Sequence, residues 1–371
     1  MPPTEPDAIL FETSPFANID AIVQHDGRVV YFYLNGHTID GQNRFNTRAV
    51  WVQNLIEAPY VLDEDEARSG IAPMLPRTCC KQTKPVPMLD PDQLEIVWFE
   101  EGNGAALRRK KTADSEAETL AVIPPWSGLE GFHGYAAGCI AESPLCWPMP
   151  DNPKLQQRIE SAARFWQACR SDDHPFTDLQ PKILAAYDQV FATSQEDEKG
   201  KPSDTHYFSI DGGKFPPRGL VQYPSAGVIA TVGLSLCPQP AVELFVDDPV
   251  NYRRIELAIR LTSQQMADSD LVESVSRQLS SLAAYPWRNL TWLGPGHTCG
   301  LSGMQTDSQL ALLVPDSQIS TATSAPAVSL PSFQADPVNL LWLLPITADQ
   351  QQQLEAGAIN ADQLLDRNSG A

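Results

Sequence analysis

Residues 1–150 contain several short runs of β-branched and aromatic residues, and turn-forming residues separate these runs. Such side chains favour extended strands because they pack well on a pleated surface. Gly, Asn, Asp and Pro cluster between the runs, and the apolar residues there follow no strong helical period. The simplest structure that this pattern predicts is an antiparallel sheet with strands at 28–34, 48–53, 94–100 and 119–123.

A helix is predicted directly after this β-rich region. Pro153 suits the first helical position, and apolar residues follow it at spacings of three and four: Leu155, Ile159, Ala162, Trp166 and Cys169. A second helix is expected over 181–193. The charged segment 194–204 also contains Gly and Pro, so we expect an exposed loop or linker there.

The second half of the chain returns to strand-like runs. In 255–261, apolar residues alternate strictly with Glu256, Ala258 and Arg260, which predicts a strand of a sheet with one solvated face. A helix is indicated over 268–284, and Pro286 is expected to end it. Further strands are expected at 206–210, 227–235, 242–246, 310–314 and 338–344.

The C-terminal apolar run is the most informative segment of the sequence. Residues 340–344 are typical of a strand that is buried on both faces, and Pro345 is expected to stop its ladder pairing. Thr347 is followed three residues later by Gln350, the reciprocal N-cap pattern. A final helix should therefore begin at Thr347.

The 371 residues are too many for one ordinary core, so two domains are the natural expectation. The 32 prolines and 22 glycines fall in many short clusters, which indicates numerous turns. The predicted fold class is α+β, with two α/β sub-domains whose mixed, largely antiparallel sheets are flanked by helices. The expected divisions are a β-rich N-terminal domain, connecting helices with a charged linker, and a second α+β domain, at 1–150, 151–204 and 205–371.

The charge balance is strongly acidic, with 26 basic and 46 acidic residues and a formal net charge of −20. Such a surface repels nucleic acid and anionic membranes, because phosphate binding depends on Lys and Arg. It attracts a basic protein partner and speeds that encounter. The acidity can also serve only to keep a cytoplasmic protein soluble, and the sequence leaves both interpretations open.

A cytoplasmic location is expected from three features of the sequence. No stretch approaches the roughly 18–20 continuous apolar residues that span a bilayer. The N-terminus lacks the basic start and apolar core of a signal peptide. The seven cysteines are scattered and odd in number, which is typical of reduced thiols and not of a disulfide framework.

The motifs that point to catalysis are weak. His297 and Cys299 follow a Gly-Pro-Gly turn, but a structural metal site needs about four ligands, and the sequence supplies no further ones at suitable spacing. Adjacent Cys79 and Cys80 are interpreted as unrelated thiols. No G-x-S-x-G nucleophile motif occurs. The basic run 108–111 is expected to form an exposed hairpin tip. We therefore expect no catalytic residues, no cofactor and no metal.

Several multi-residue segments, in consistent order, resemble the Suppressor of fused (Sufu) family. In the second half they are 217–220, 227–235, 253–261, 292–297 and the terminal run 338–347, which reads VNLLWLLPIT. The first half is similar to the N-terminal part of long bacterial Sufu-like proteins at 51–55, 72–80, 97–107 and 122–136. The resemblance implies the Sufu fold of two α/β domains.

What the resemblance implies for function is protein binding without a cofactor. The animal Sufu protein binds and restrains a zinc-finger transcription factor, and bacterial Sufu-like proteins are found among immunity proteins that neutralise toxins. An immunity protein acting on a basic toxin is therefore the expected function. Two alternatives stay open: a regulatory scaffold that binds an endogenous peptide along a sheet edge, and an enzyme that uses His297 or His133.

The expected contact surface combines acidic clusters with exposed aromatic residues. Trp is a common anchor of protein interfaces. Trp51, Trp98 and Trp342 lie in predicted strands and are assigned to the core, whereas two tryptophans lie in Pro/Gly-rich loops. The candidate partner-binding residues are Asp63, Glu64, Asp65, Glu66, Trp126, Trp147, Asp247 and Asp248.

Overall fold

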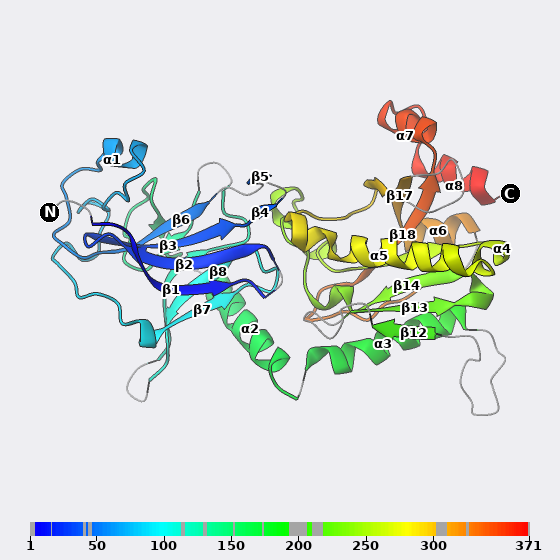
Figure 1. Ribbon diagram of the computed structural model, residues 1–371, viewed down its shortest axis with the longest axis horizontal. Helices are drawn as coiled ribbons and strands as arrows, with labels where there is room; N and C mark the ends of the chain where they lie inside the picture. The colour runs from blue at the N-terminus through cyan, green and yellow to red at the C-terminus, as the bar shows by residue number, and fades with distance from the viewer. Residues whose placement is uncertain are drawn as a thin grey trace. The chain divides into compact units, whose positions relative to one another are not determined.

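The structure is a computed structural model of the 371-residue chain (Figure 1). It describes residues 4–15, 17–39, 42–43, 47–112, 116–128, 132–150, 153–172, 174–192, 206–209, 218–301, 310–323 and 326–369. The chain divides into two compact units. Unit 1 comprises Met1–Ala168, Glu243–Phe245 and Trp287–Leu290, and unit 2 comprises Cys169–Val242, Val246–Pro286 and Thr291–Ala371. The predicted linker 194–204 lies outside the described residues.

The first sheet of unit 1 has four antiparallel strands in the order β1-β2-β3-β6. Its strands are β1 (Asp7–Thr13), β2 (Ile19–His25), β3 (Val29–Gly36) and β6 (Arg48–Asn54). Val23, Phe32 and Val50 are fully buried in it. The predicted strands at 28–34 and 48–53 are confirmed, and β1 and β2 are additional strands. Two short strands, β4 (Thr38–Ile39) and β5 (Gln42–Asn43), pair with each other.

The second sheet of unit 1 has the order β11-β10-β9-β8-β7. Its strands are β7 (Leu94–Trp98), β8 (Ala105–Arg109), β9 (Glu118–Ile123), β10 (Tyr135–Ala136) and β11 (Trp147–Pro148). Helix α2 (Pro153–Cys169) begins at the predicted proline and packs Leu155 and Ile159 against Val97 and Val122. The described part of the first half thus forms two larger sheets and the short β4-β5 pair, where the sequence pattern predicted one sheet. The remaining elements are α1 (Glu64–Arg68) and the 3₁₀ turn η1 (Pro91–Gln93).

Unit 2 is built on one seven-stranded sheet with the order β12-β13-β14-β15-β18-β17-β16. The β15–β18 pair is parallel and the other pairs are antiparallel. The strands are β12 (His206–Ser209), β13 (Gly219–Tyr223), β14 (Val228–Val232), β15 (Ile255–Arg260), β16 (Thr298–Gly300), β17 (Leu310–Pro315) and β18 (Asn339–Ile346). The protein therefore has the predicted α+β fold, with mixed, largely antiparallel sheets flanked by helices.

Helices cover the sheet of unit 2. Its two long helices are α3 (Pro175–Phe191) and α5 (Ser269–Asn289), and strands β13 and β14 lie between them in Figure 1. Tyr187 of α3 donates to the Thr231 carbonyl at 3.1 Å, and Gln222 of β13 donates to Ser276 of α5 at 3.4 Å. The shorter helices are α4 (Ser263–Met266), α6 (Asp316–Thr323), α7 (Ala348–Glu355) and α8 (Ala361–Ser369), and the 3₁₀ turns are η2 (Pro224–Ala226), η3 (Leu234–Leu236), η4 (Val242–Leu244) and η5 (Pro249–Asn251).

The C-terminal run forms the interior strand β18 of this sheet, between β15 and β17. Residues 340–343 are buried, which confirms a strand with two covered faces. Thr347 accepts from the Gln350 N–H at 3.2 Å and the Gln350 side chain accepts from the Thr347 N–H at 2.8 Å, so the predicted capping box starts α7. Pro345, however, does not end the strand. It lies opposite Ala311 of β17, beyond the last residue that pairs with β15, where only one neighbouring strand remains.

One further predicted strand was wrong, and two predicted helices are present but have different ends. The strand expected at 242–246 is replaced by η4, because Ala241 has a positive φ of 64° and turns the chain there. Helix α3 begins at Pro175, capped by His174, and runs through Pro181. Helix α5 runs past Pro286, whose position in the last turn removes only one ladder hydrogen bond.

The prediction of one solvated face for β15 was also wrong, because Glu256 is fully buried. Its carboxylate accepts from the Thr231 hydroxyl at 2.6 Å and from the Gly233 N–H at 3.0 Å. It also accepts from the N–H and hydroxyl of Ser235, at 3.0 and 2.7 Å. These four donors replace water, so an alternating polar residue on this strand does not face solvent.

Candidate functional site

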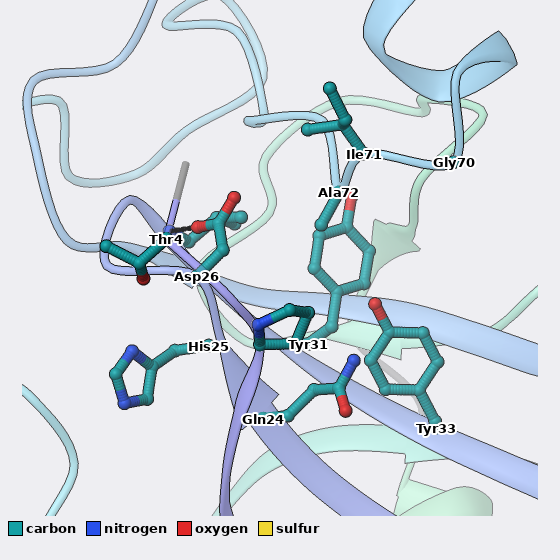
Figure 2. A pocket seen from close by; sticks show the side chains of 11 residues that line it. Thr4, Gln24, His25, Asp26, Tyr31, Tyr33, Gly70, Ile71 and Ala72 are labelled. Atoms are coloured by element: carbon teal, nitrogen blue, oxygen red, sulfur yellow. Dashed lines mark hydrogen bonds between the residues drawn. The ribbon is translucent and has the colours of Figure 1, made fainter. Parts of the chain in front are cut away.

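A small pocket opens on the first sheet of unit 1, next to helix α1 (Figure 2). It has a volume of about 170 Å³. Its walls come from strands β2 and β3, from the N-terminal segment and from the chain that follows α1. The lining residues are Thr4, Pro6, Gln24, His25, Asp26, Val29, Tyr31, Tyr33, Gly70, Ile71 and Ala72.

Two tyrosines form the aromatic wall of the pocket. Tyr31 and Tyr33 are two residues apart on β3 and therefore point to the same face of the sheet, with ring centroids 5.7 Å apart. The Tyr31 hydroxyl donates to the Pro73 carbonyl at 2.7 Å. Figure 2 shows the Tyr33 hydroxyl and the Gln24 amide facing the same space. The ring faces, two polar groups and an aliphatic wall thus surround one small volume.

Both phenols stay protonated at neutral pH. Burial raises the pKa of Tyr31 well above its usual value, and the negative charges near it act in the same direction. Burial also raises the pKa of Tyr33, although a hydrogen bond with Gln24 lowers it in part. The pocket therefore offers neutral aromatic faces with a partial negative charge.

A buried ion cluster ties the pocket to helix α1. Arg28 donates to Asp26 through Nε at 3.1 Å and Nη2 at 2.8 Å, to Glu66 through Nη1 at 2.5 Å, and to the Ala72 carbonyl at 3.1 Å. Burial lowers the pKa of Arg28, but the hydrogen bonds and charges of both carboxylates raise it above its usual value. Two carboxylates share one guanidinium, so the cluster carries one negative charge at the pocket wall.

The four acidic residues predicted for the partner surface form the start of α1. Asp63 caps the helix by accepting from the N–H groups of Asp65 and Glu66 at 3.0 and 3.1 Å. Glu64 and Asp65 are exposed and pair with Arg68 at 2.7 and 2.9 Å. Glu66 instead turns inward to Arg28. The structure thus places three exposed carboxylates directly before the segment that lines the pocket.

The two candidate tryptophans lie elsewhere in unit 1. Trp126 is half-buried against the core under α2, and the Arg158 guanidinium lies 5.0 Å from its ring centroid. Trp147 on β11 has 36% of its surface exposed and packs against Phe132, with ring centroids 4.8 Å apart and the ring planes tilted by 56°. Trp147 is therefore the more accessible of the two. Trp51, Trp98 and Trp342 are buried, as the strand pattern predicted.

The remaining candidate carboxylates, Asp247 and Asp248, are exposed residues of unit 2. Asp248 accepts from the Asn251 side chain at 2.5 Å. Two apolar side chains that follow them in the chain are also exposed, Val250 at 40% and Tyr252 at 37%. This pair of carboxylates therefore forms a second acidic surface, within unit 2.

The basic run 108–111 is exposed only at Lys110 and Lys111, after the end of β8, and not over its whole length as the sequence predicted. Arg108 and Arg109 belong to β8, the strand between β7 and β9, so Arg108 is only 8% exposed. Arg108 lies 3.8 Å from Glu95, Arg109 pairs with Glu118, and Lys111 pairs with Glu116 at 2.8 Å. The carboxylates therefore offset much of its positive charge.

The loop with His297 and Cys299 has the contacts of a structural turn. His297 accepts from the Gly294 N–H at 3.3 Å and packs edge-on against Trp292 at 4.5 Å. Burial raises the pKa of Cys299 to about 11, which keeps its sulfur a thiol at neutral pH. His133 is half-buried. Within the described ranges, no group of three or more His, Cys, Asp or Glu side chains is arranged to hold a metal ion.

Comparison with known protein families gives a match in the second half of the chain. Residues 206–370 match the model of the family described as Suppressor of fused protein (SUFU). These residues form a Sufu-like domain. It holds all seven strands of the larger sheet, and the run that carried the resemblance is its interior strand β18, between β15 and β17.

The comparison with solved structures finds the Sufu-Fu complex crystal structure, at 15% sequence identity and a TM-score of 0.28. That match covers 51% of this chain and 82% of the other. A comparison with curated proteins gives no match. Among the described helices, in the Sufu-like domain and outside it, none has the length and apolar character needed to cross a membrane.

Sequence reasoning missed the tyrosine pocket. The alternation of Tyr31 and Tyr33 on β3 was a visible signal, because residues two apart share a face of a strand. Its partners were not visible, since Gln24 lies on a strand that was not predicted and Ile71 reaches the site from a loop. The acidic segment 63–66 was found, although its place beside a pocket was not.

Proposed function

We propose that this chain is a non-catalytic binding protein of Sufu type, and that it neutralises a basic protein toxin by stoichiometric binding in a bacterial cytoplasm. The observation that carries the proposal is the match of residues 206–370 to the Sufu family, which is a protein-binding family. A protein is therefore the class of partner that we assign to this chain.

The charge of the chain supports a basic partner. The formal net charge is −20, and exposed carboxylates occur in both units, at Glu64 and Asp65 and at Asp247 and Asp248. Complementary charge speeds encounter and discriminates against partners of the same sign. A toxin that acts on nucleic acid carries a cationic surface, because it must bind phosphates. An acidic inhibitor gains rate and selectivity from covering that surface.

A catalytic function is less well supported by the geometry. The raised pKa of Cys299 leaves a poor nucleophile, because the thiolate is the reactive form. His297 uses its Nδ1 atom on a backbone N–H of its own turn. Neither residue is arranged as an activated pair.

A tagged pull-down from the native cytoplasm tests the proposal, with washes at low and then high salt and identification by mass spectrometry. We expect one basic partner that is retained at low salt and released at high salt. Expression of that partner alone should stop growth, and co-expression with this chain should restore it. Recovery of the tagged chain alone, or a partner that is harmless when expressed alone, would contradict the toxin proposal.

A further inference from the structure

We propose that the tyrosine pocket of unit 1 receives a lysine or arginine side chain of a protein partner. The inference rests on the proposed function and specifies which chemical group of the partner is recognised. It assigns a role to Tyr31, Tyr33 and Gln24 that the family match over residues 206–370 does not supply, since the pocket lies outside that match.

The size of the pocket fits one side chain. Its volume of about 170 Å³ is below the range of about 300–1,000 Å³ that is usual for cofactor and drug-sized ligands. The pocket is open on one side and its lining includes exposed and half-buried residues, such as Thr4, Pro6 and Ile71. A side chain that projects from a protein surface can therefore enter it without a rearrangement of the sheet.

The chemistry of the walls fits a cation on an aliphatic stem. The neutral ring of Tyr33 is half-buried and attracts a positive charge placed over its face within about 6 Å, and the ring of Tyr31, only 4% exposed, lies behind it with centroids 5.7 Å apart. The Tyr33 hydroxyl and the Gln24 carbonyl oxygen are hydrogen-bond acceptors for an ammonium or a guanidinium. Ile71, which is half-buried, provides apolar surface for the methylene groups of Lys or Arg.

The ion cluster at the pocket wall selects against an anion. The hydrogen bonds of Arg28 engage four of its five N–H groups, with Asp26, Glu66 and the Ala72 carbonyl as acceptors. An incoming carboxylate or phosphate would meet two carboxylates and a guanidinium with little donor capacity left. A cation instead meets a net negative charge, which is less screened by salt because Asp26 and Arg28 are buried.

Helix α1 extends this negative field to the surface. Asp63, Glu64 and Asp65 are exposed on the helix that leads into the pocket-lining segment, and Arg68 offsets one of these three negative charges. Glu66 fixes the same helix to Arg28. Exposed carboxylates attract a basic partner over about a Debye length, roughly 8–10 Å at ordinary salt. The acidic helix and the pocket thus act on the same part of a partner, first by attraction and then by insertion of one side chain.

The direct test uses N-acetyl-arginine methylamide as the probe and the citrulline analogue, which has nearly the same shape without the charge, as its control. Tyrosine ring resonances of the full-length chain are followed by NMR during the titration. We expect the Tyr31 and Tyr33 signals to shift with a dissociation constant on the order of 1 mM. The citrulline analogue should bind at least about fivefold more weakly, as expected for the loss of a cation–π contact. Equal binding of both probes, or no shift at these two rings, would overturn the inference.

Two variants make the test independent of a folding defect. Ile71→Arg places a tethered cation at the half-buried edge of the pocket and should abolish binding of the arginine probe. Tyr33→Phe keeps the ring and should weaken binding only about twofold to fivefold, through loss of one hydrogen bond. The matched control Tyr60→Phe alters a tyrosine that is 73% exposed and outside the pocket, and should leave binding unchanged. Probe binding to the Ile71→Arg chain that equals the wild type would contradict the assigned site.

The inference and the proposed function fail in different ways. If the partner from the pull-down binds the Ile71→Arg chain as tightly as the wild type, the pocket inference is wrong and the proposed function stands. If the arginine probe binds in the pocket but no protein partner is recovered, the pocket chemistry stands and the proposed function is wrong.

Discussion

Arg28 donates a hydrogen bond to Glu66, and this contact fixes helix α1 to the start of strand β3. The same guanidinium satisfies the buried carboxylate of Asp26, whose side chain is 5% exposed. Replacement of Arg28 by alanine would leave that carboxylate buried without its cation. We expect a loss of about 3–5 kcal/mol in the free energy of unfolding, measured by urea unfolding and followed by far-UV circular dichroism.

The matched control for this variant is Arg68→Ala on the same helix. Arg68 also pairs with two carboxylates, Glu64 and Asp65, but its side chain is 69% exposed. Exposed pairs contribute less than about 1 kcal/mol, so the two substitutions should differ clearly. Similar losses of unfolding free energy in both variants would show that the buried Arg28 ion cluster stabilises the fold no more than an exposed ion pair does.

The buried carboxylate of Glu256 should be important for the stability of unit 2. Glu256→Ala removes the acceptor of the Gly233 and Ser235 N–H groups, and we expect a loss of at least about 2 kcal/mol in the free energy of unfolding. Glu256→Gln keeps one oxygen acceptor and should be milder. Urea unfolding of both variants at one pH gives the comparison, and an alanine variant as stable as the glutamine variant would refute it.

Glu256 should also give the stability a pH dependence. Burial raises its pKa above the usual value, although hydrogen bonds from Thr231, Ser235 and Gly233 lower it in part. The folded chain therefore binds this proton more tightly than the unfolded chain does. As pH rises from the unfolded pKa to the raised folded pKa, the contribution of Glu256 to the free energy of unfolding falls. Unfolding of the wild type and of Glu256→Gln is measured in steps from about pH 4 upward, and the difference between their free energies of unfolding should fall as the pH rises. A difference that does not change with pH would contradict the raised pKa of Glu256.

Gly227 is required where β14 begins. Its φ is 67°, and a Cβ atom there would lie 2.1 Å from the Leu261 carbonyl oxygen. Gly227→Ala should therefore cost more than about 2 kcal/mol of unfolding free energy. Gly357, with a φ of 66° and no atom within 4 Å of the added Cβ, is the control and should cost only about 1 kcal/mol. Equal thermal shifts for the two variants would contradict the predicted clash.

The reactivity of the cysteine thiols tests whether the His297–Cys299 loop contains an activated nucleophile. The pKa of Cys299 and that of Cys80 are both raised to about 11, in each case mainly by burial. At pH 8 only about one in a thousand of these sulfurs is a thiolate, so alkylation by iodoacetamide should be slow and should accelerate about tenfold per pH unit. Mass-spectrometric mapping measures the rate at each cysteine. Fast alkylation of Cys299 at pH 7 would indicate an activated nucleophile and would favour the enzyme alternative.

The elements that were best predicted from the sequence are those whose start signal and burial pattern lie within one short segment. The apolar run of β18 with its capping box, and helix α2 behind Pro153, each carry their own start signal and burial pattern. β1 and β2 carry weaker patterns, and β1 has mostly exposed and half-buried residues, as expected for an edge strand. The period-two alternation wrongly predicted that Glu256 faces solvent. Its hydrogen-bond donors come from residues 231–235, which are distant in the sequence.

The candidate site was predictable only in part, for the same physical reason. Acidic residues 63–66 follow one another in the chain and were recognised as a cluster. The pocket joins four separate segments, and the Arg28–Glu66 contact spans 38 residues. No local sequence pattern could therefore predict the pocket. The tertiary fold also changed the exposure of individual residues, since it buried Arg108 and turned Glu66 inward.

We propose that the chain acts by stoichiometric binding and not by turnover. The most direct measurement is a titration of the activity of the captured partner against purified chain, with native mass spectrometry of the mixture. We expect the activity to fall linearly and to reach zero at one equivalent, with an intact 1:1 complex and no mass change in either protein. Complete inactivation by a small fraction of an equivalent, accompanied by a covalent change or cleavage of the partner, would contradict the claim and show an enzyme.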